Sequence, residues 1–459
     1  MDDLSSTTDA PCPAAVASTP ASTGAASTPA STAAPAPASR EPDRAPGTTT
    51  GPGPRGRRGS VVRLLGPAFV AAIAYVDPGN IAANMSAGAR YGYLLLWVLV
   101  VANAMAVLVQ YLSAKLGAVT GRSLAEVLGE RLGRRARLVY WAQAELVAAA
   151  TDVAEVIGGA IALQILFGVP LVPGGVLVGV VSMLLLAVQS RRGQRAFEHV
   201  VIAFLALITV GFLSGLVLDP PDPGALAEGL LPRFHGPDTV VLAASMLGAT
   251  VMPHAIYLHS GLVRDRHGGG GSPARIRRLL RATRWDVVLS LLVAGSVNIA
   301  MLVLAAEALP GVPGTDTIEG AHHAIAQASG PVIATLFGVG LLASGLASTS
   351  VGAYAGAQIM EGLLHVRVPL LIRRAVTLVP ALALLAIGAE PTWTLVLSQV
   401  MLSIGIPFAL VPLVVLTSRR ALMGDFANGR PMRLAAAMVA LAIIALNVAL
   451  VVLTALGLG

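Results

Sequence analysis

The chain has 459 residues, of which 55% are hydrophobic and only 12% are charged. Soluble globular domains carry about 25% charged residues, so this composition excludes a soluble fold and indicates a polytopic membrane protein. The net charge of +7 does not indicate a nucleic-acid partner, because the arginines fall in short loops between apolar segments. The single cysteine, Cys12, excludes an intramolecular disulfide and a cysteine metal site.

The first segment, residues 1–60, is rich in Ala, Pro, Ser and Thr and nearly lacks large apolar side chains. Such a segment cannot bury enough apolar surface to offset the entropy lost on ordering. It also lacks the apolar core of a signal peptide. We therefore expect a disordered cytoplasmic tail, followed by a transmembrane transporter domain over residues 61–459.

About eleven apolar spans follow, each long enough to cross a bilayer as a helix. They lie near 62–84, 92–117, 138–166, 172–189, 197–218, 238–262, 283–306, 331–362, 370–388, 393–417 and 433–456. The spans divide into a first repeat (61–218), a second repeat (238–417) and one extra helix (433–456). The predicted fold class is all-α.

The arginines predict the orientation of these spans. The arginine-rich loops all fall on one side of the membrane if the N-terminus lies inside, and the opposite loops are poor in arginine. Basic loops stay cytoplasmic. We therefore expect a cytoplasmic N-terminus, an extracellular C-terminus and a location in the cell membrane.

The first span contains a helix-breaking motif, Asp77-Pro78-Gly79-Asn80. A residue before proline is pushed out of helical geometry, and Gly79 permits the turn that follows. A carboxylate at mid-bilayer is costly, so Asp77 should face a cavity and a cation, with the amide oxygen of Asn80 beside it. The alternative is a kink that Asp77 merely caps, but a proline kink requires no aspartate.

The third span carries three carboxylates, Glu145, Asp152 and Glu155. Spacings of seven and three residues place them on one face of a helix. Acidic side chains inside a membrane span mark proton or cation paths. The alternative is a set of salt bridges, for which Arg373 and Arg374 at the start of the ninth span are the candidate partners; such pairs would make a conduit of alternating charge.

The sixth span contains a second break, Met252-Pro253-His254. Pro253 cannot donate a backbone hydrogen bond, so a carbonyl one turn earlier, around Ala249, is left free. A methionine in a membrane span is usually a filler, but Met252 lies at a break. A thioether favours softer transition metals, whereas magnesium and calcium prefer oxygen ligands alone. Asp77, Asn80, Met252 and the Ala249 carbonyl therefore predict a site for Mn²⁺ or Fe²⁺.

Three further polar positions admit two interpretations each. His254 is a ligand or a proton carrier; we favour the carrier, because it does not share a helix face with Met252. Gln399, inside the tenth span, completes the metal shell or forms an interhelical hydrogen bond. His322 and His323 are expected to lie in an outer loop, either as a weak metal-attracting vestibule or as part of a solvated loop; we favour the solvated loop.

The two breaks predict an inverted repeat. The sixth span lies five spans after the first and runs in the opposite direction, and a proline breaks each at mid-depth. Broken helices at corresponding places in two halves indicate a transporter whose binding site lies at their interface near the midplane.

The motifs together resemble the Nramp family of proton-coupled divalent metal transporters. The resemblance rests on the two breaks, on the acidic segment of the third span, on Tyr257-Leu258-His259-Ser260 and on residues 355–362, and it covers about 60–456. It implies a leucine-transporter-like fold with alternating access. It implies metal coordination by Asp77, Asn80, Met252 and the Ala249 carbonyl, with Gln399 joining in some states. It implies proton handling by Asp77, Asp152, Glu155 and His254, with Arg373 and Arg374 along the exit route.

The predicted function is symport: import of Mn²⁺ and Fe²⁺, with Cd²⁺, Co²⁺ and Zn²⁺ as further cargo, coupled to protons. We expect no enzyme activity, no cofactor and a monomer in the lipid bilayer. One alternative is a sodium-coupled amino-acid transporter of the same fold, although Asp77 would repel the substrate carboxylate. Another is an intramembrane aspartyl protease using Asp77 and Asp152, which would leave the broken helices unexplained.

Overall fold

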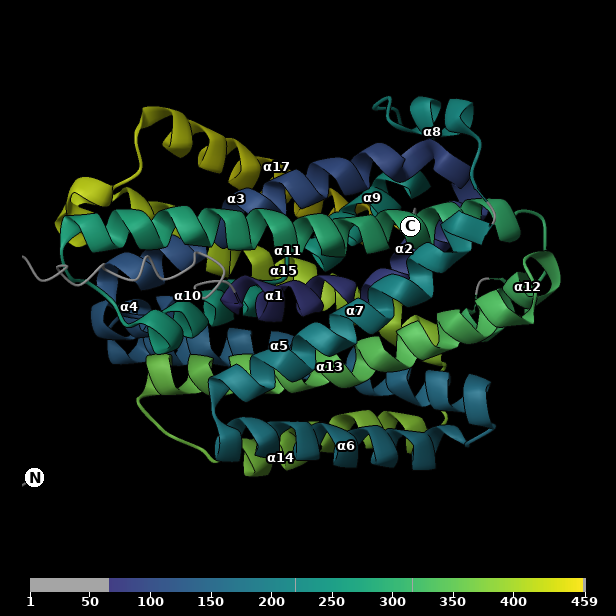
Figure 1. Ribbon diagram of the computed structural model, residues 1–459, viewed down its shortest axis with the longest axis horizontal. Coiled ribbons are helices and arrows are strands. Elements are labelled where there is room, and N and C mark those ends of the chain that lie inside the picture. Colours follow the sequence, from purple (N-terminus) through teal and green to yellow (C-terminus); the bar gives the residue numbers. More distant parts are fainter. Residues whose placement is uncertain (1–65, 219, 316, 457–459) are drawn as a thin grey trace, which may run out of the picture. The chain divides into compact units, whose positions relative to one another are not determined.

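The computed structural model describes residues 66–218, 220–315 and 317–456. The predicted tail (1–60) and the arginines before the first span lie outside these ranges. In the described residues every regular element is a helix. Figure 1 shows long helices packed in layers around α1, the element that leads into the first break.

Nine helices of the described ranges are long and apolar enough to cross a membrane, when the two halves of the sixth span are taken as one helix. The eight that are single elements are α3 (Leu96–Thr120), α5 (Arg134–Phe167), α6 (Leu171–Arg192), α7 (Gln194–Leu218), α11 (Pro273–Ala308), α13 (Pro331–Leu364), α15 (Pro391–Ser418) and α17 (Arg430–Ala455). The other two predicted spans are the broken first helix and α14 (Leu370–Ala386), which has 17 residues. The eleven predicted spans thus all correspond to helices.

Shorter helices connect the spans. They are α4 (Leu124–Arg131), α8 (Pro223–Gly229), α12 (Ile318–Ala328) and α16 (Arg420–Met423), with 3-10 turns η3 (Gly92–Leu95) and η4 (Gly424–Phe426). The expectation of a solvated loop at His322 and His323 is wrong, because both lie on α12. Thr317 caps this helix by accepting a hydrogen bond from Gly320 N, and Ile318 and Ile325 are buried beneath it.

Both predicted breaks are present. The first helix consists of α1 (Pro67–Ala72) and the 3-10 turn η2 (Ile73–Val76), then extended Asp77, then α2 (Pro78–Tyr91). The sixth consists of α9 (Pro237–Thr250) and α10 (Pro253–His267), with Val251 and Met252 outside helical geometry between them. In each case a proline occupies the first position of the second helix, where its missing N–H costs nothing.

The packing joins equivalent helices of the two halves. α3 contacts α11, α5 contacts α13 and α6 contacts α14. The broken helices cross, so that α1 packs on α10 and α2 on α9. This reciprocal pattern is what a two-fold relation between inverted repeats produces. It brings the two breaks together inside the bundle.

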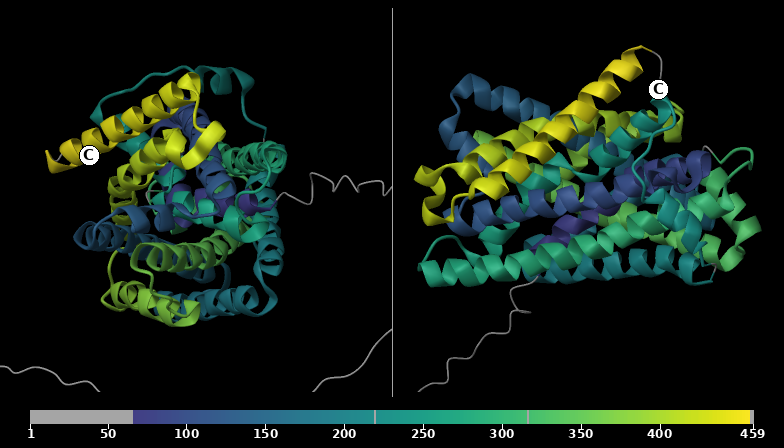
Figure 2. Two further views of the ribbon diagram at one scale, coloured as in Figure 1. Left: turned by 90° about the vertical axis from the view of Figure 1, so that its left-hand side faces the viewer. Right: turned by 90° about the horizontal axis from the view of Figure 1, so that it is seen from above.

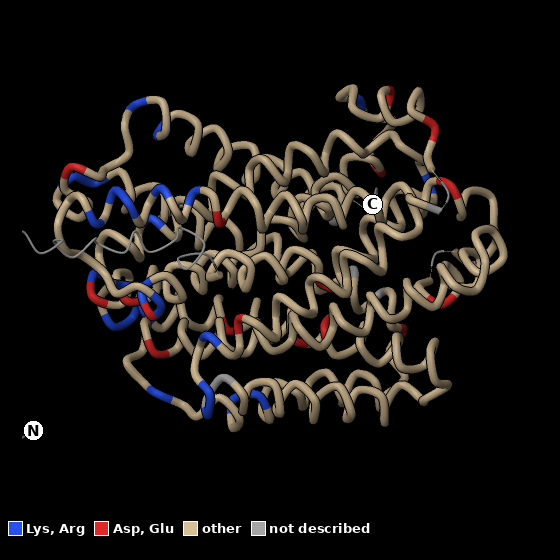
Figure 3. Tube along the Cα trace, in the orientation of Figure 1, with Lys and Arg blue, Asp and Glu red and all other residues tan. Residues whose placement is uncertain are grey.

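Helix α17, the predicted extra helix, packs against α9 and α15 at the periphery (Figure 2). Lysine and arginine gather at one end of the bundle, on the left in Figure 3. This end joins α3 to α5 and α15 to α17, so the basic loops described here lie on a common side, as expected. That this side is cytoplasmic stays a prediction.

Candidate metal site

Asp77 lies at the first break and uses one carboxylate oxygen locally. Its Oδ1 accepts hydrogen bonds from the backbone N of Asn80 at 2.9 Å and from Asn80 Nδ2 at 2.6 Å, so it does cap α2. Its Oδ2 is buried and has no protein partner. Capping therefore accounts for one oxygen only, and the second is available for a ligand.

Asn80 connects the two breaks. Its Nδ2 donates to the carbonyl oxygen of Ala249, 2.8 Å away across the interface between α2 and α9. That carbonyl would bond the N–H four residues later in an unbroken helix, but residue 253 is a proline and has none. Pro253 therefore leaves the Ala249 carbonyl without its helical partner, and the Asn80 side chain supplies a hydrogen bond in its place. Asn80 Oδ1 is buried without a partner.

Gln399 of α15 reaches the same place. A Cβ added at Gly79 would lie 1.5 Å from Gln399 Nε2 and 3.1 Å from Asp77 Oδ2, so glycine alone leaves room for this amide. Both amide atoms of Gln399 are buried without a hydrogen-bond partner. Met252 is fully buried at the second break, where it precedes the first turn of α10.

These residues leave an unusual group of polar atoms without partners. Asp77 Oδ2, Asn80 Oδ1 and both amide atoms of Gln399 are buried and unsatisfied. Each such atom costs roughly 1–3 kcal/mol unless something binds it. In the described residues no three His, Cys, Asp or Glu side chains form a metal-binding group. A cation here would instead be held by carboxylate, amide and carbonyl oxygens.

The acidic face of α5 meets the predicted arginines. Arg373 Nη2 donates to Glu145 Oε1 at 2.7 Å, and Arg374 Nη1 lies 3.2 Å from Asp152 Oδ1. Arg374 also donates from Nε to Ser182 Oγ at 2.9 Å. The ion pairs that were considered as an alternative are therefore present at Glu145 and Asp152.

Glu155 differs from the other two carboxylates of α5. It is fully buried and forms no ion pair with an arginine of the described residues, whereas Glu145 and Asp152 each do. One turn later, a Cβ at Gly158 would lie 2.2 Å from Pro78 Cβ, so this face of α5 lies directly against the first break. A Cβ at Gly352 of α13 would lie 3.2 Å from Glu155 Oε2. The free carboxylate is thus enclosed between the break and α13.

His254 follows Met252 on α10 and is 2% exposed. Both nitrogens of its ring are buried without a hydrogen-bond partner. A buried imidazole without partners fits a group that exchanges protons better than a structural one. Its role in proton transfer stays a prediction.

A polar network centred on Asn298 of α11 holds the turn before Asp77. Asn298 Nδ2 donates to the carbonyl of Tyr75 at 2.9 Å, and Asn298 Oδ1 accepts from Asn84 Nδ2 at 3.1 Å. The hydroxyl of Ser344 donates to the carbonyl of Val76. Asn84 lies one turn after Asn80 on the same face of α2, and this spacing was the available signal.

Comparison with known proteins agrees with this architecture. The family model described as natural resistance-associated macrophage protein-like (Nramp) matches residues 68–453. The chain belongs to the Nramp family. The expected resemblance is thereby confirmed over nearly all of the residues that carry the fold and both breaks.

Individual relatives extend the comparison. The divalent metal cation transporter MntH of Mycobacterium tuberculosis is 62% identical over 394 residues, which are 86% of this chain and 92% of the relative. The Bacillus subtilis MntH is 44% identical over 401 residues, 87% of this chain and 93% of the relative.

Solved structures place this Nramp chain among known folds. The manganese transporter of Eremococcus coleocola, solved with an aromatic bis-isothiourea compound, superposes with a TM-score of 0.77 at 32% identity, covering 84% of this chain and 85% of that one. Mhp1, a nucleobase-cation-symport-1 family transporter, superposes with a TM-score of 0.57 at 15% identity, covering 84% and 89%. The second likeness concerns the fold alone, which is leucine-transporter-like.

Proposed function

We propose that this chain is a divalent metal transporter of the cell membrane that imports Mn²⁺ and Fe²⁺ together with protons by alternating access. The main support for this proposal is a group of buried polar atoms on Asp77, Asn80 and Gln399 that have no hydrogen-bond partner, where the two helix breaks lie together. The Mycobacterium tuberculosis and Bacillus subtilis relatives are named divalent metal cation transporters. Cd²⁺, Co²⁺ and Zn²⁺ are further cargo, because they share the softness that a thioether favours.

Each ligand has a distinct part in binding. The Asp77 carboxylate supplies the negative charge that offsets desolvation of the cation, and Asn80 Oδ1 supplies a neutral oxygen. Ala249 contributes a carbonyl when the Asn80 amide turns toward the metal. Met252 supplies the sulfur that disfavours Ca²⁺ and Mg²⁺. Gln399 completes the shell from α15.

Protons take a separate route along α5. Glu155 lies beside the first break with no ion-pair partner, so it exchanges a proton at lower cost than the paired Asp152 and Glu145. Arg374 and Arg373 then make the alternating charges that lead toward the arginine-rich end of the bundle. His254, two residues after Met252 on α10, takes or returns a proton as α10 moves.

The test is Mn²⁺ uptake into proteoliposomes that contain a pH-sensitive dye, with excess Ca²⁺ as competitor. We compare wild type with Met252→Leu, which removes the sulfur and keeps the volume. Met246→Leu is the matched control, since Met246 is also fully buried, on α9 ahead of the break. We expect wild type and the control to take up Mn²⁺ with protons and to resist Ca²⁺, and Met252→Leu to become at least about tenfold more sensitive to Ca²⁺.

Two outcomes would overturn parts of the proposal. If Met252→Leu resists Ca²⁺ like the control, the sulfur is not a ligand. If wild type moves no divalent metal, the cargo assignment fails, and sodium-dependent uptake of an amino acid becomes the next measurement.

A further inference from the structure

A cavity of about 540 Å³ lies at the arginine-rich end of the bundle, between α15 and α17, far along α15 from Gln399. Its polar rim consists of Arg419, Arg430, Arg433 and Ser418. Its walls are aliphatic and include Val415 and Leu434. The cavity therefore combines positive charge with an apolar surface.

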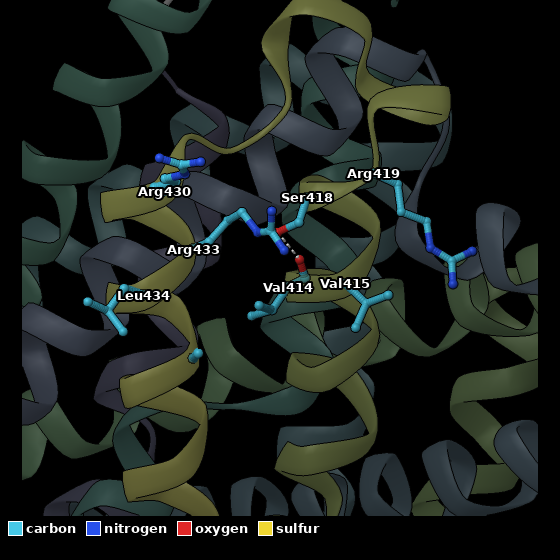
Figure 4. Close-up of a pocket in the computed structure, with 8 residues that line it drawn as sticks. Val414, Val415, Ser418, Arg419, Arg430, Arg433 and Leu434 are labelled. Carbon is cyan, nitrogen blue, oxygen red and sulfur yellow. Dashed lines mark hydrogen bonds between the residues drawn. The ribbon is translucent and has the colours of Figure 1, made fainter.

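Figure 4 shows how the rim is built. Arg433 extends from α17 toward Ser418 of α15 and spans the space between the two helices, while Arg430 lies at the start of α17. Val414 and Val415 on α15 and Leu434 on α17 lie further from that end. The charged groups are thus gathered at the end of the bundle and the aliphatic groups lie deeper along the helices.

The arginines of this rim are not neutralised by the protein. In the described residues none of the three guanidinium groups forms an ion pair, and Asp425, in the connection between the helices, is not paired with them either. Arg430 and Arg433 lie on one side of α15 and Arg419 extends to the other (Figure 4), so two uncompensated cations at this cavity favour an anion there.

A further positive charge lies behind the rim. Lys115 is 7% exposed, and its Nζ donates to Asn428 Oδ1 at 2.8 Å. Asn428 in turn donates from Nδ2 to Thr417 Oγ1 at 2.9 Å and to Ser418 Oγ at 3.4 Å. Because Ser418 lines the cavity, this chain of hydrogen bonds ties the buried ammonium group to the cavity wall.

The aliphatic walls open toward the surface of the bundle. Leu434 is 63% exposed and Val415 is 43% exposed. On the periphery of a membrane bundle such side chains face acyl chains. A ligand here meets cations at its polar end and hydrocarbon along its length, which is the chemistry of a phospholipid with an anionic headgroup.

We propose that the cavity between α15 and α17 binds an anionic phospholipid of the leaflet at the arginine-rich end, with Arg430 and Arg433 holding its phosphate. The general preference of basic loops for the cytoplasmic side accounts for arginines at this end. It does not account for a cavity with an aliphatic wall beneath them. The proposal is independent of the transported ion.

The test uses delipidated full-length protein in detergent, titrated with cardiolipin or with zwitterionic phosphatidylcholine and measured by native mass spectrometry. The variant is Arg430→Gln/Arg433→Gln. The matched control is Arg134→Gln/Arg135→Gln, which removes the same charge from two exposed arginines at the start of α5, outside the cavity. Arg430→Lys/Arg433→Lys keeps the charge and shows whether any loss follows charge rather than folding.

We expect wild type and the control to bind cardiolipin in preference to phosphatidylcholine. The glutamine variant should bind cardiolipin roughly 30-fold more weakly, since each basic side chain near an anionic lipid surface contributes a factor of about five. The lysine variant should retain most of the affinity.

Two results would overturn the proposal. One is equal loss of cardiolipin binding in the glutamine variant and in the Arg134/Arg135 control, which would mean that total charge, not this cavity, attracts lipid. The other is displacement of cardiolipin by inorganic phosphate at equal concentration. That result would identify a soluble phosphate ligand and would mean that the aliphatic wall does not contribute to binding.

Discussion

Asn80 donates a hydrogen bond from Nδ2 to the carbonyl oxygen of Ala249, 2.8 Å away, and so joins the two broken helices. Two prolines make the contact possible. Pro78 sets the break that places Asn80 in the first turn of α2, and Pro253 deprives the Ala249 carbonyl of its helical partner. A cation bound to Asn80 Oδ1 and to the Ala249 carbonyl oxygen would share the groups of this hydrogen bond, so we expect metal binding and the relation of the two halves to be coupled.

Replacing Asn80 with alanine tests this coupling. Asn80→Ala removes one proposed oxygen ligand and also the donor to the Ala249 carbonyl. We expect Mn²⁺ affinity, measured by isothermal titration calorimetry, to fall at least about tenfold, since even groups that only orient a ligand are worth 10–100-fold.

The control for this prediction is Asn84→Ala. Asn84 is also buried on α2, but its amide donates to Asn298, not to α9. Its Mn²⁺ affinity should stay within about threefold of wild type. Equal losses in the two variants would mean that the amides of α2 act on the fold and not on the metal.

Adding one methyl group at Gly79 should remove Gln399 from the site. The new Cβ would lie 1.5 Å from Gln399 Nε2, so the amide must move away. We expect Gly79→Ala and Gln399→Ala to slow Mn²⁺ uptake to a similar extent, about tenfold, and Gly79→Ala/Gln399→Ala to be no slower than either, because each change alone already takes the Gln399 amide out of the site. Gly133→Ala, where an added Cβ meets nothing within 4 Å, should leave uptake unchanged. A double variant clearly slower than Gln399→Ala would assign the additional defect to the backbone at Gly79.

Removing only one partner of the ion pair between Arg374 and Asp152 should destabilise the protein more than removing both partners. Arg374 is fully buried and Asp152 is 1% exposed, so either charge alone is costly. Removing one partner of a buried pair costs about 3–5 kcal/mol. We expect Arg374→Gln to lower the melting temperature in detergent clearly, and Arg374→Gln/Asp152→Asn to restore most of it.

Measuring uptake as well as melting temperature distinguishes an effect on stability from an effect on transport. The double variant should remain poor in proton-coupled uptake, because both members of the proposed route are gone. Arg367→Gln is the control, since its ion pair with Glu361 is exposed and such pairs are worth little. A melting temperature of the double variant below that of Arg374→Gln would contradict the argument.

The sequence predicts the features of this protein that depend on local chemistry. Prolines beside Asp77 and Met252 specify where the helices break, and the spacing of Glu145, Asp152 and Glu155 specifies a common face. The sequence also suggests the arginines of the ninth span as partners of those carboxylates. Only the structure shows that Arg373 pairs with Glu145 and Arg374 with Asp152. These long-range pairings depend on helix tilt and rotation, which packing sets and sequence does not reveal.

Other contacts cannot be predicted from the sequence either, because they too depend on how the helices pack. Nothing around Asn298 marks it as the partner of the Tyr75 carbonyl, 223 residues earlier. The short helix at His322 and His323 was missed because its apolar face is brief and lies within a turn-rich stretch. Asp286 was read as part of an apolar span, and its partners at the start of α1 become visible only in three dimensions.

Those partners lead to the last prediction. Asp286 of α11 accepts hydrogen bonds from Gly66 N through Oδ1 and from Ala68 N through Oδ2, each at 3.0 Å. A carboxylate at the start of a helix complements its free N–H groups, and hydrogen bonds to a charged group are worth about 1.5–3 kcal/mol. Asp286 therefore anchors the start of α1 to α11 at the arginine-rich end. We expect an opening of the metal site toward that end by movement of α1 to release this anchor.

Asp286→Ala should loosen α1 selectively. We expect amide hydrogen exchange over residues 67–76 to quicken at least about tenfold, while α13 keeps its protection, because the loss of one such bond already shifts a local opening equilibrium by that factor. Ser290→Ala is the control, since Ser290 lies one turn on in α11 and bonds only the Val287 carbonyl of its own helix. Unchanged exchange over 67–76 in Asp286→Ala would mean that packing against α10, and not this carboxylate, holds α1 in place.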